Sequence, residues 1–355
     1  MLNEENNIIV IDDGKYQIRA GFPGNLTPNF TIESESTIPQ KFSNLIPKGI
    51  FQDWDYIEQT WTEIFKNKMQ IDPQTHKILV SESPLEPIQN RFVKAEILFE
   101  KFQFQKAFFA IQNVLALYGS GKTTGVSVNL GFDTISIVPI FDEKIFPNSI
   151  KRLEIGGWDI DQYLFQLLME NSQNKNLAQQ KSLSAFIRKA KEKFAFLESN
   201  NFDSSNFLLG NITKKQALFQ EHPEIRIDWN DENSKCAEIL FNPQLYGINN
   251  FGIQKLLHIS IDKKSPLLSR KKLFENILLF GGSSQIHGLK ERLSQELPLL
   301  TSKSLTFNID AQKSNENLVW IGGSFVASKV LRSTDWIDKS EYSEYGESIC
   351  YKKCF

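Results

Sequence analysis

Two stretches of the chain repeat one pattern, and this repetition constrains the fold more than any other feature. Ile8–Phe22 and Val126–Phe141 each contain a run rich in β-branched residues, a turn with Gly, and a second alternating run. This pattern is typical of a β-hairpin. The turns, Asp12–Asp13–Gly14 and Asn129–Leu130–Gly131, can offer backbone N–H groups to a phosphate. We therefore expect a duplicated, two-lobed chain whose hairpins face each other around a nucleotide tail, although ordinary strand–turn–strand structure fits the same pattern.

The bulk numbers fit a soluble globular protein of this kind. With 355 residues the chain exceeds one typical core, so we expect two domains or one large two-lobed unit. The formal charge is −2, from 40 basic and 42 acidic residues. Such a balance creates no general attraction to nucleic acid or to an anionic membrane.

Targeting signals and metal motifs are weak. The start, MLNEENN, lacks the basic and apolar regions of a secretory signal, and no apolar run is long enough to span a bilayer. The three cysteines, Cys236, Cys350 and Cys354, cannot all pair within the chain, which favours free thiols in a reducing compartment. None of the four histidines lies beside the Cys350/Cys354 pair, so we expect no metal site there.

Hydrophobic periodicity predicts the main elements between and after the hairpins. Four segments read as helices: Gln52–Lys68, Asn90–Phe102, Asp159–Gln173 and Ser182–Ser199. Lys77–Ser81 reads as a buried strand, whereas Phe202–Lys235 is polar and poorly periodic and supports no assignment. Ile277–Leu297 and Leu318–Leu331 each read as a strand, a Gly–Gly–Ser turn and a helix. We expect Gly281–Gly282 to approach a ligand and Gly322–Gly323 to serve tight packing instead.

Loop Gly119–Gly125 resembles a phosphate-binding P-loop only superficially. That motif needs a Gly five positions before the second Gly, but Ala116 stands five positions before Gly121. The preceding residues also look helical, whereas a P-loop follows a strand. We therefore reject a P-loop.

Six motifs follow one another in a familiar order: Pro84–Phe104, Ala110–Gly125, Lys151–Leu164, Phe280–Leu293, Val319–Lys329 and Trp336–Phe355, which ends in KCF. Together they make the chain resemble actin and the actin-related proteins over nearly its whole length. The resemblance implies the α/β, bilobal ATPase fold shared with hexokinase and the heat-shock chaperones. It also implies a nucleotide between the lobes and a return of Trp336–Phe355 to the first lobe.

The resemblance further implies four subdomains, of which the second is truncated. Subdomain 1 would comprise residues 1–32, 50–119 and 318–355, and the truncated subdomain 2 residues 33–49. Subdomain 3 would comprise residues 120–156 and 250–317, and subdomain 4 residues 157–249.

The family's nucleotide site transfers to this sequence position by position. Asp12, Gly14 and Lys15 fall in the first phosphate loop, and Arg19 stands where the family has a phosphate-facing Lys. Gln112 falls where the family orients the attacking water, a role that we expect to be vestigial here. The remaining expected nucleotide contacts are Asn129, Gly131, Gly157, Arg188, Lys191, Gly281, Gly282 and Ser283. ATP or ADP with Mg²⁺ is the implied cofactor, with no direct protein ligand to the metal.

Several departures from the family pattern affect chemistry. Lys15 and Tyr16 replace a small Ser and Gly, Asn129 and Phe132 replace two loop Asp residues, and Asp133 replaces a Gly. Ala185 and Glu316 replace a Glu and a Lys that hold the nucleoside. Each lost preorganised charge costs about 10²–10³ in rate when it acts on the transition state. We therefore expect slow or absent hydrolysis, unless compensating residues such as Lys15 restore the site.

A deletion and a retained groove shape the expected contacts with partners. Only seven residues separate Pro39 from Pro47, which leaves no room for the mobile loop that docks into the next subunit of a filament. The receiving groove keeps Tyr118, Gly121, Thr123, Ile321 and Phe325. Lys329 and Arg332 replace apolar residues there, which favours a partner with acidic residues.

These features predict a divergent actin-related structural or regulatory subunit of a cytoskeletal assembly, dynactin-like or ciliary, with weak or no ATPase and no self-polymerisation. Its partners would be actin, actin-related or other cytoskeletal proteins, without direct nucleic-acid contact or membrane insertion. We place it in the cytoplasm and cytoskeleton, with the cilium as a further location and the nucleus less favoured. Two alternatives remain open: an active, polymerising ATPase of actin type, and a nuclear subunit of a chromatin remodeller.

Overall fold

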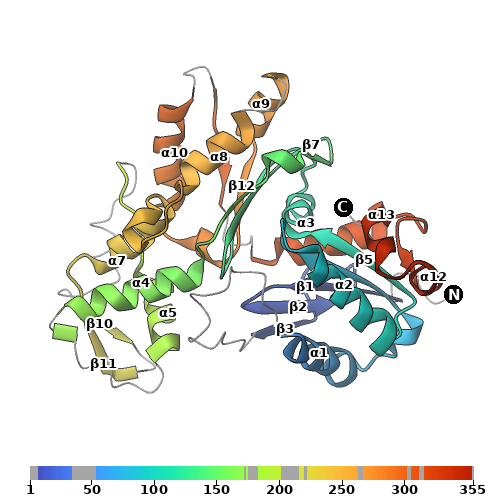
Figure 1. Ribbon diagram of the computed structural model, residues 1–355. Helices are drawn as coiled ribbons and strands as arrows, with labels where there is room; N and C mark the ends of the chain where they lie inside the picture. Colours follow the sequence, from blue (N-terminus) through green and yellow to red (C-terminus); the bar gives the residue numbers. More distant parts are fainter. Residues whose placement is uncertain are drawn as a thin grey trace. The chain divides into compact units, whose positions relative to one another are not determined.

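The computed structural model describes residues 7–33, 53–171, 173–174, 183–200, 216–219, 222–262, 267–301, 305–311 and 316–353. The chain divides into two compact units, as expected for a two-lobed α/β protein (Figure 1). Unit 1 comprises Met1–Val128, Val138–Arg152 and Ser314–Phe355, and unit 2 comprises Asn129–Ile137 and Leu153–Lys313. The shortened stretch from Pro39 to Pro47 and Cys354 lie outside the described residues.

Unit 1 is built on a six-stranded mixed sheet with the order β14-β5-β4-β1-β2-β3. Its strands are β1 (Ile8–Asp13), β2 (Gln17–Gly21), β3 (Phe30–Glu33), β4 (Lys77–Glu82), β5 (Lys106–Ile111) and β14 (Ile337–Asp338). β1 pairs with β4 and β4 with β5 in parallel, whereas β1 and β2 form an antiparallel hairpin. The first predicted hairpin and strand are therefore confirmed, and β14 brings the C-terminal segment back to this sheet as expected.

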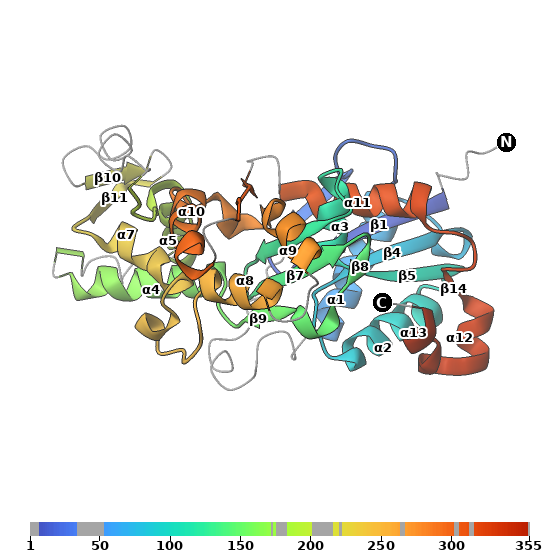
Figure 2. The ribbon, with the colours of Figure 1, turned by 90° about the horizontal axis from the view of Figure 1, so that it is seen from above.

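Helices cover both faces of this sheet. Figure 2 shows α3 (Gln112–Gly119) and α11 (Leu318–Phe325) on one face, with α1 (Trp54–Thr62), α2 (Ile88–Glu96), α12 (Lys339–Tyr345) and α13 (Ile349–Lys353) on the other. α1 and α2 each continue as a π-helical turn, Glu63–Lys68 and Ile97–Lys101. Both predicted helices are thus confirmed where the structure describes them.

The core beneath α1 is aromatic. Asp53 caps α1 by accepting a hydrogen bond from the Tyr56 N–H at 3.0 Å, which fixes where the helix begins. Phe65, on the inward face predicted from helical spacing, is fully buried. Its ring makes edge contacts with Phe102 and Phe104 at centroid distances of 5.0 and 5.1 Å. Such edge-to-face pairs add about 0.5–1.5 kcal/mol each beyond area burial.

The prediction of a strand–turn–helix unit at Leu318–Leu331 is wrong in its first part, because α11 and a following π-helical turn (Val326–Val330) occupy this segment. A short apolar run cannot be assigned to strand or buried helix by periodicity alone. The predicted packing role of the glycines is correct. A Cβ on Gly322 would lie 1.7 Å from the carbonyl oxygen of Leu115 on α3. A Cβ on Gly119 would lie 2.3 Å from the carbonyl oxygen of Leu318, so these two helices touch backbone to backbone.

The second large sheet has the order β13-β12-β6-β7-β8, and β9 pairs with β7. Its strands are β6 (Gly125–Leu130), β7 (Ile135–Phe141), β8 (Lys144–Ile145), β9 (Lys151–Leu153), β12 (Ile277–Phe280) and β13 (Ile309–Asp310). The second predicted hairpin, β6 and β7, is confirmed, and its turn belongs to unit 2. A separate pair, β10 (Gln216–Phe219) and β11 (His222–Asp228), lies in the segment for which the sequence supported no assignment.

The helices of unit 2 are α4 (Gly157–Glu170), α5 (Leu183–Phe194), α7 (Glu232–Lys235), α8 (Ile253–Asp262), α9 (Leu267–Phe274) and α10 (Leu289–Leu300). Three of them, α4, α5 and α10, confirm predicted helices, whereas α7, α8 and α9 were not predicted from the sequence. Between β12 and α10 lies a single 3₁₀ turn, Gly282–Gln285, which begins at the second glycine of the pair. The strand–Gly–helix prediction for Ile277–Leu297 is therefore correct apart from this turn.

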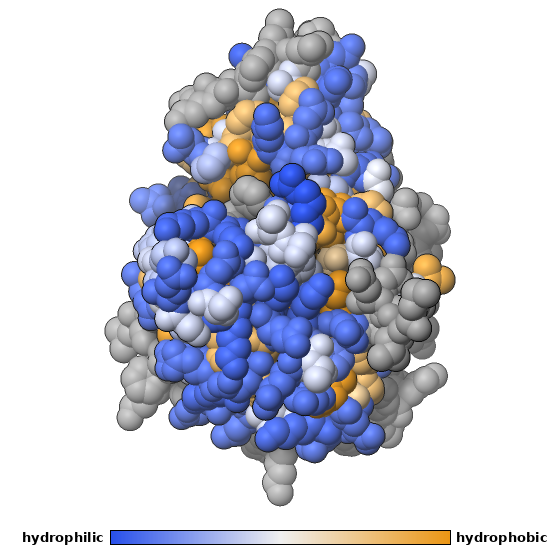
Figure 3. All heavy atoms as spheres, turned by 90° about the vertical axis from the view of Figure 1, so that its right-hand side faces the viewer, coloured by the Kyte–Doolittle hydropathy of each residue, from blue (hydrophilic) through white to orange (hydrophobic). Residues whose placement is uncertain are grey.

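One face of the molecule can be described by its hydropathy. The face drawn in Figure 3 is mostly hydrophilic, with separate hydrophobic patches. In the part of the chain that the structure describes, no helix has both the length and the apolar character needed to cross a bilayer.

The contact between α3 and α11 gives a first prediction. We expect Gly322→Ala to lower the free energy of unfolding by roughly 1–3 kcal/mol or more, because its methyl group would overlap the Leu115 carbonyl. Thermal and denaturant unfolding of the purified variant measure this loss. Gly282→Ala is the matched control, since a Cβ there meets nothing within 4 Å. Equal stability of both variants would contradict the backbone contact.

Candidate functional site

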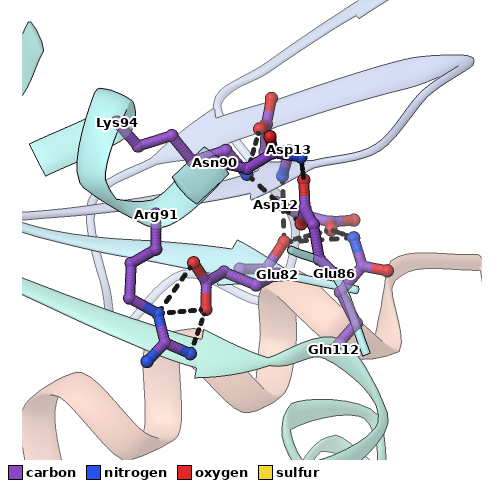
Figure 4. A network of polar contacts seen from close by, with 9 residues as sticks. Asp12, Asp13, Glu82, Glu86, Asn90, Arg91, Lys94 and Gln112 are labelled. Atoms are coloured by element: carbon purple, nitrogen blue, oxygen red, sulfur yellow. Dashed lines mark hydrogen bonds and ion pairs between the residues drawn. The ribbon is translucent and has the colours of Figure 1, made fainter. Parts of the chain in front are cut away.

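Unit 1 contains a buried polar cluster where β1 and β4 end (Figure 4). Ser81 donates its hydroxyl hydrogen to Asp12 Oδ1 at 2.9 Å and accepts one from the Asp13 N–H at 2.9 Å. Burial raises the pKa of the Asp12 carboxyl above its ordinary value, and the nearby Arg19 guanidinium opposes this effect. The hydroxyl of Ser81 thus ties the first Gly turn to the neighbouring parallel strand.

Arg19 and Gln112 complete this cluster. Arg19 donates to Asn317 Oδ1 at 2.9 Å and to Gln17 Oε1 at 2.7 Å, and it lies 3.4 Å from Asp12. Gln112, at the start of α3, donates from Nε2 to Asp12 at 3.4 Å and to Ser81 at 3.3 Å. The structure therefore brings the expected residues Asp12, Arg19 and Gln112 together, but it uses their polar groups to bind one another.

The first Gly turn is tight, and its lysine lies near an acid. A Cβ on Gly14 would lie 2.4 Å from the carbonyl oxygen of Gln17, so only Gly fits there. Lys15 and Tyr16, the two departures in this turn, are partly buried. Burial acts to raise the pKa of Glu86. The charges of Lys94 and then Lys15 act in the opposite direction, and the pKa lies below its ordinary value.

Helix α2 supplies two cations that the sequence analysis missed, the buried Lys94 and the partly buried Arg91. Lys94 Nζ lies 3.1 Å from Asp13 Oδ2 and 3.7 Å from Glu86 Oε2. Arg91 makes a separate pair with Glu82, 2.6 Å from its Oε2 (Figure 4). A signal for Lys94 existed, because it shares a helical face with Asn90 and Ile97, both of which are buried.

In unit 2 the expected glycines converge on one place. Gly157 N–H donates to the Gly131 carbonyl at 2.9 Å, which joins the start of α4 to the turn of the second hairpin. Gly281 has φ +88°, and a Cβ there would lie 2.6 Å from Asn129 Oδ1 and from the Leu130 carbonyl. A Cβ on Gly282 would meet nothing within 4 Å, so its face is open.

A buried cation lies beside this glycine cluster. Lys191 Nζ donates to the Gly157 carbonyl at 3.0 Å and lies 2.8 Å from Asp161 Oδ1. A Cβ on Gly157 would lie 3.0 Å from the Ser283 hydroxyl and 3.3 Å from Lys191 Nζ. Burial raises the pKa of Asp161, while Lys191 and then Arg188 act in the opposite direction. Glycine at position 157 therefore leaves room beside a buried hydroxyl and a buried ammonium group, which a side chain there would contact.

The substituted loop residue Phe132 contacts an aromatic ring and a cation. The Phe132 and Trp158 rings lie 5.9 Å apart, and the Arg188 guanidinium lies 5.0 Å from the Phe132 ring centroid. Arg188 also lies 3.4 Å from Asp161. Phe132 therefore replaces a charged group by a cation–π partner, which holds Arg188 without adding a carboxylate.

The three remaining departures from the family pattern differ in their exposure to solvent. Asp133 is buried, whereas Ala185 in unit 2 and Glu316 in unit 1 are exposed. Neither Ala185 nor Glu316 offers the side-chain charge that the family pattern has at that position. Across the described residues, no group of three or more His, Cys, Asp or Glu side chains is arranged to hold a metal ion.

The residues predicted to form a partner groove belong to unit 1, and Tyr118 lies at the end of α3 away from Gln112. The Tyr118 and Phe325 rings lie 6.1 Å apart, and Phe325 is 47% exposed. A cavity of about 950 Å³ adjoins them, lined by Tyr118, Ile145, Val326, Val330, Leu331 and Arg332, among others. Gly121, Thr123, Ile321, Phe325 and Lys329 are not among its lining residues. Of the predicted groove residues, only Tyr118 and Arg332 line this cavity, so the groove stays a prediction.

The rim of this cavity is fixed by hydrogen bonds. Asp142 and Glu143 turn between β7 and β8 with φ 46° and 66°, a conformation that non-Gly residues rarely adopt. Glu143 N–H donates to the Thr123 carbonyl at 3.1 Å, and Asp142 N–H to the Thr124 hydroxyl at 2.9 Å. Burial, then the Glu143 carboxylate, raises the pKa of Tyr118. Arg332 is 82% exposed in its side chain and pairs locally with Asp335.

The comparisons with known proteins agree with this architecture. The sequence profile of the family described as Actin matches residues 36–355. Actin-29 of Dictyostelium discoideum is 31% identical over 384 aligned positions, which cover 99% of this chain and 97% of the relative. The chain belongs to the actin family. It is divergent within that family, and its bilobal α/β fold is the one predicted from the motifs.

The actin family generally binds ATP or ADP with Mg²⁺, so we compare the glycine clusters with the needs of such a ligand. The clusters fit such a group: a Cβ at position 157 would fill space beside a hydroxyl and an ammonium group, and the face of Gly282 is open. These observations concern unit 2. In unit 1 the Gly14 turn is the corresponding candidate.

The buried pair in unit 2 gives a second prediction. We expect Lys191→Met to lower the free energy of unfolding by about 3–5 kcal/mol, because Asp161 would lose its closest cation inside the protein. Chemical denaturation measures the change. Lys193→Met, at an exposed position on the same helix, is the control and should stay within about 0.5 kcal/mol of the parent. Similar losses in both variants would contradict this account.

Proposed function

We propose that this actin-family protein is a nucleotide-bound structural or regulatory subunit of a cytoskeletal assembly, with little or no ATPase activity of its own. The cradle around Gly157 carries the nucleotide part of the proposal. The Lys191 ammonium group is bonded to the Gly157 carbonyl, and the Ser283 hydroxyl lies on the same side of Gly157, 3.0 Å from where a Cβ would stand.

Each of these groups has a definite task toward a bound nucleotide. Lys191 and Ser283 would supply a charge and a hydroxyl to a polar edge of the ligand, and Gly282 would let the ligand approach the backbone. In unit 1 the Gly14 turn would hold phosphate oxygens, with Lys15 as a nearby cation. Bound Mg²⁺ would neutralise phosphate charge. Asn129 would offer this metal's surroundings an amide, without a negative charge.

Weak hydrolysis is supported by the substituted loop residues and by Gln112. A water-positioning residue needs free polar groups in line with the phosphate. Gln112 is buried and its Nε2 donates to Asp12 and Ser81. Phe132 holds Arg188 by its ring and supplies no carboxylate. These residues favour binding and positioning over the stabilisation of a transition state.

The absence of self-polymerisation is supported by chain length. The alignment with actin-29 spans 384 positions, whereas this chain has 355 residues, so at least 29 aligned positions have no residue here. We place part of this difference between Pro39 and Pro47, which only seven residues separate. A chain without the loop that docks into its neighbour would be built in as a single copy, because it cannot repeat a head-to-tail contact.

The partner that we propose for the cavity near Tyr118 is an apolar segment of a cytoskeletal protein that also carries acidic residues. The apolar lining from Val326, Val330 and Leu331 fits the first property. Lys329 and Arg332, both exposed beside it, fit the second. We place this assembly in the cytoplasm, with the cilium as a further location. A nuclear chromatin-remodelling subunit is the alternative, and affinity purification that recovers a remodelling ATPase would favour it.

A third prediction concerns catalysis. Purified protein should retain ATP or ADP, yet release phosphate from Mg-ATP more slowly than conventional actin measured in parallel. We also expect Gln112→Ala to leave that low rate unchanged, because the side chain serves Asp12 and Ser81 instead of a water molecule. Phosphate release and chromatography of the bound nucleotide measure the two properties. A rate equal to that of actin, lost in Gln112→Ala, would support the active ATPase instead.

A fourth prediction concerns assembly. In polymerising salt the concentrated protein should remain monomeric by analytical ultracentrifugation and should show no helical filaments by negative-stain microscopy. Conventional actin under the same conditions is the positive control. Regular filaments of the pure protein would overturn the proposed single-copy role.

A further inference from the structure

Lys94 has no part in the function proposed above, yet it is one of the most buried charged residues described. Its side chain is 2% exposed, and its ammonium group lies 3.1 Å from Asp13 Oδ2 and 3.7 Å from Glu86 Oε2. Asn90, one helical turn earlier on α2, donates to the other oxygen of Glu86 at 2.9 Å. Helix α2 therefore holds a fixed cation between two loops of unit 1 (Figure 4).

The carboxylates around Lys94 stabilise the charged form of its ammonium group. Burial alone lowers the pKa of a lysine, but the carboxylates of Glu86, Asp13 and Glu82 outweigh burial and raise the pKa of Lys94. The group is thus charged at every physiological pH. An unpaired buried ammonium or carboxylate would cost several kcal/mol, so Lys94 and its acids depend on one another.

One of those acids belongs to the candidate phosphate turn. Asp13 is the last residue of β1 and directly precedes Gly14, and its N–H is already fixed by the Ser81 hydroxyl. Its carboxylate places a negative charge at a turn whose backbone would have to accept a phosphate. Lys94 offsets that charge from the helix side. It also holds the Asp13 side chain in place, so that it cannot turn toward an incoming anion.

The second acid anchors Lys94 independently of the turn. Glu86 lies in the loop between β4 and α2, with Lys15 and Arg152 as further cations near it. Loss of Lys94 would leave Glu86 with these cations, whereas Lys94 is the ion-pair partner of Asp13 within the part of the chain that the structure describes. The effect of removing Lys94 should therefore concentrate on Asp13 and its turn.

We propose that Lys94 is a positioning residue for phosphate binding: its buried ammonium group is the built-in counter-cation of Asp13, and it sets both the charge and the geometry of the Asp13–Gly14–Lys15 turn. This inference rests on the proposed binding of a nucleotide. Lys94 acts through Asp13 and does not touch the ligand. The same cation would be unnecessary if position 13 were uncharged.

The test compares variants with and without the charge at position 13, in the full chain and with two readouts. Affinity for a fluorescent ATP analogue is measured by titration, and hydrogen exchange of the turn amides is measured without nucleotide. We expect Lys94→Met to weaken nucleotide binding at least about fivefold, the lower end of coupling between linked sites, and to speed exchange in the turn. The double variant Asp13→Asn/Lys94→Met, which removes both charges, should restore both readouts and should also fold if the single variant does not.

Arg91→Met is the matched control, because it breaks another, partly buried ion pair of α2 that does not include a residue of the turn. It should lower the free energy of unfolding without changing nucleotide affinity. Unchanged affinity and exchange in Lys94→Met, or a double variant as impaired as the single one, would overturn the role of Lys94 and leave the proposed function intact. If the parent protein binds no nucleotide, the proposed function and the phosphate part of this inference both fail. The exchange data then decide whether Lys94 still orders the turn.

Discussion

The backbone contact between α3 and α11 is the constraint on which most of unit 1 depends. Gly322 and Gly119 bring the two helices so close that no side chain can separate them. The beginning of α3 is thereby fixed with Gln112 at the Asp12 cluster, and its end with Tyr118 beside Phe325. Trp320 adds a bond from its indole N–H to the Val10 carbonyl at 3.2 Å, which anchors α11 to β1. One helix thus carries both the polar cluster and the edge of the apolar cavity.

Around this scaffold, the buried charges of each unit are largely neutralised within that unit. Asp12 has Arg19, Asp13 has Lys94, and Asp161 has Lys191. Removing one partner of such a pair costs more than the pair itself contributes, because the other charge stays buried. These pairs therefore specify one arrangement of the glycine turns instead of adding much net stability. The turns would be ordered before any nucleotide arrives.

The sequence was most informative where the signal is local. The two hairpins follow from alternation and a Gly turn, and α1 from the spacing of Trp61, Ile64 and Phe65. The nature of Leu318–Leu331 could not be decided this way, because an apolar run with two glycines suits a strand or a close-packed helix equally. The family resemblance predicted the glycines and Lys191 as site residues, whereas the residues that contact them are visible only in the structure. Asp161 shares a helical face with the buried Leu164, which was an available but unused signal.

The turn at Asp142 and Glu143 has a consequence for the kinetics of association. Two non-Gly residues in the left-handed region store of the order of 1–3 kcal/mol each, and the bonds to Thr123 and Thr124 maintain them without a partner. A rim that is already shaped loses little conformational entropy when it is covered. Encounter and orientation, and not the ordering of a loop, would then limit how fast a partner docks, and differences between partners would be expressed mainly in how long they stay.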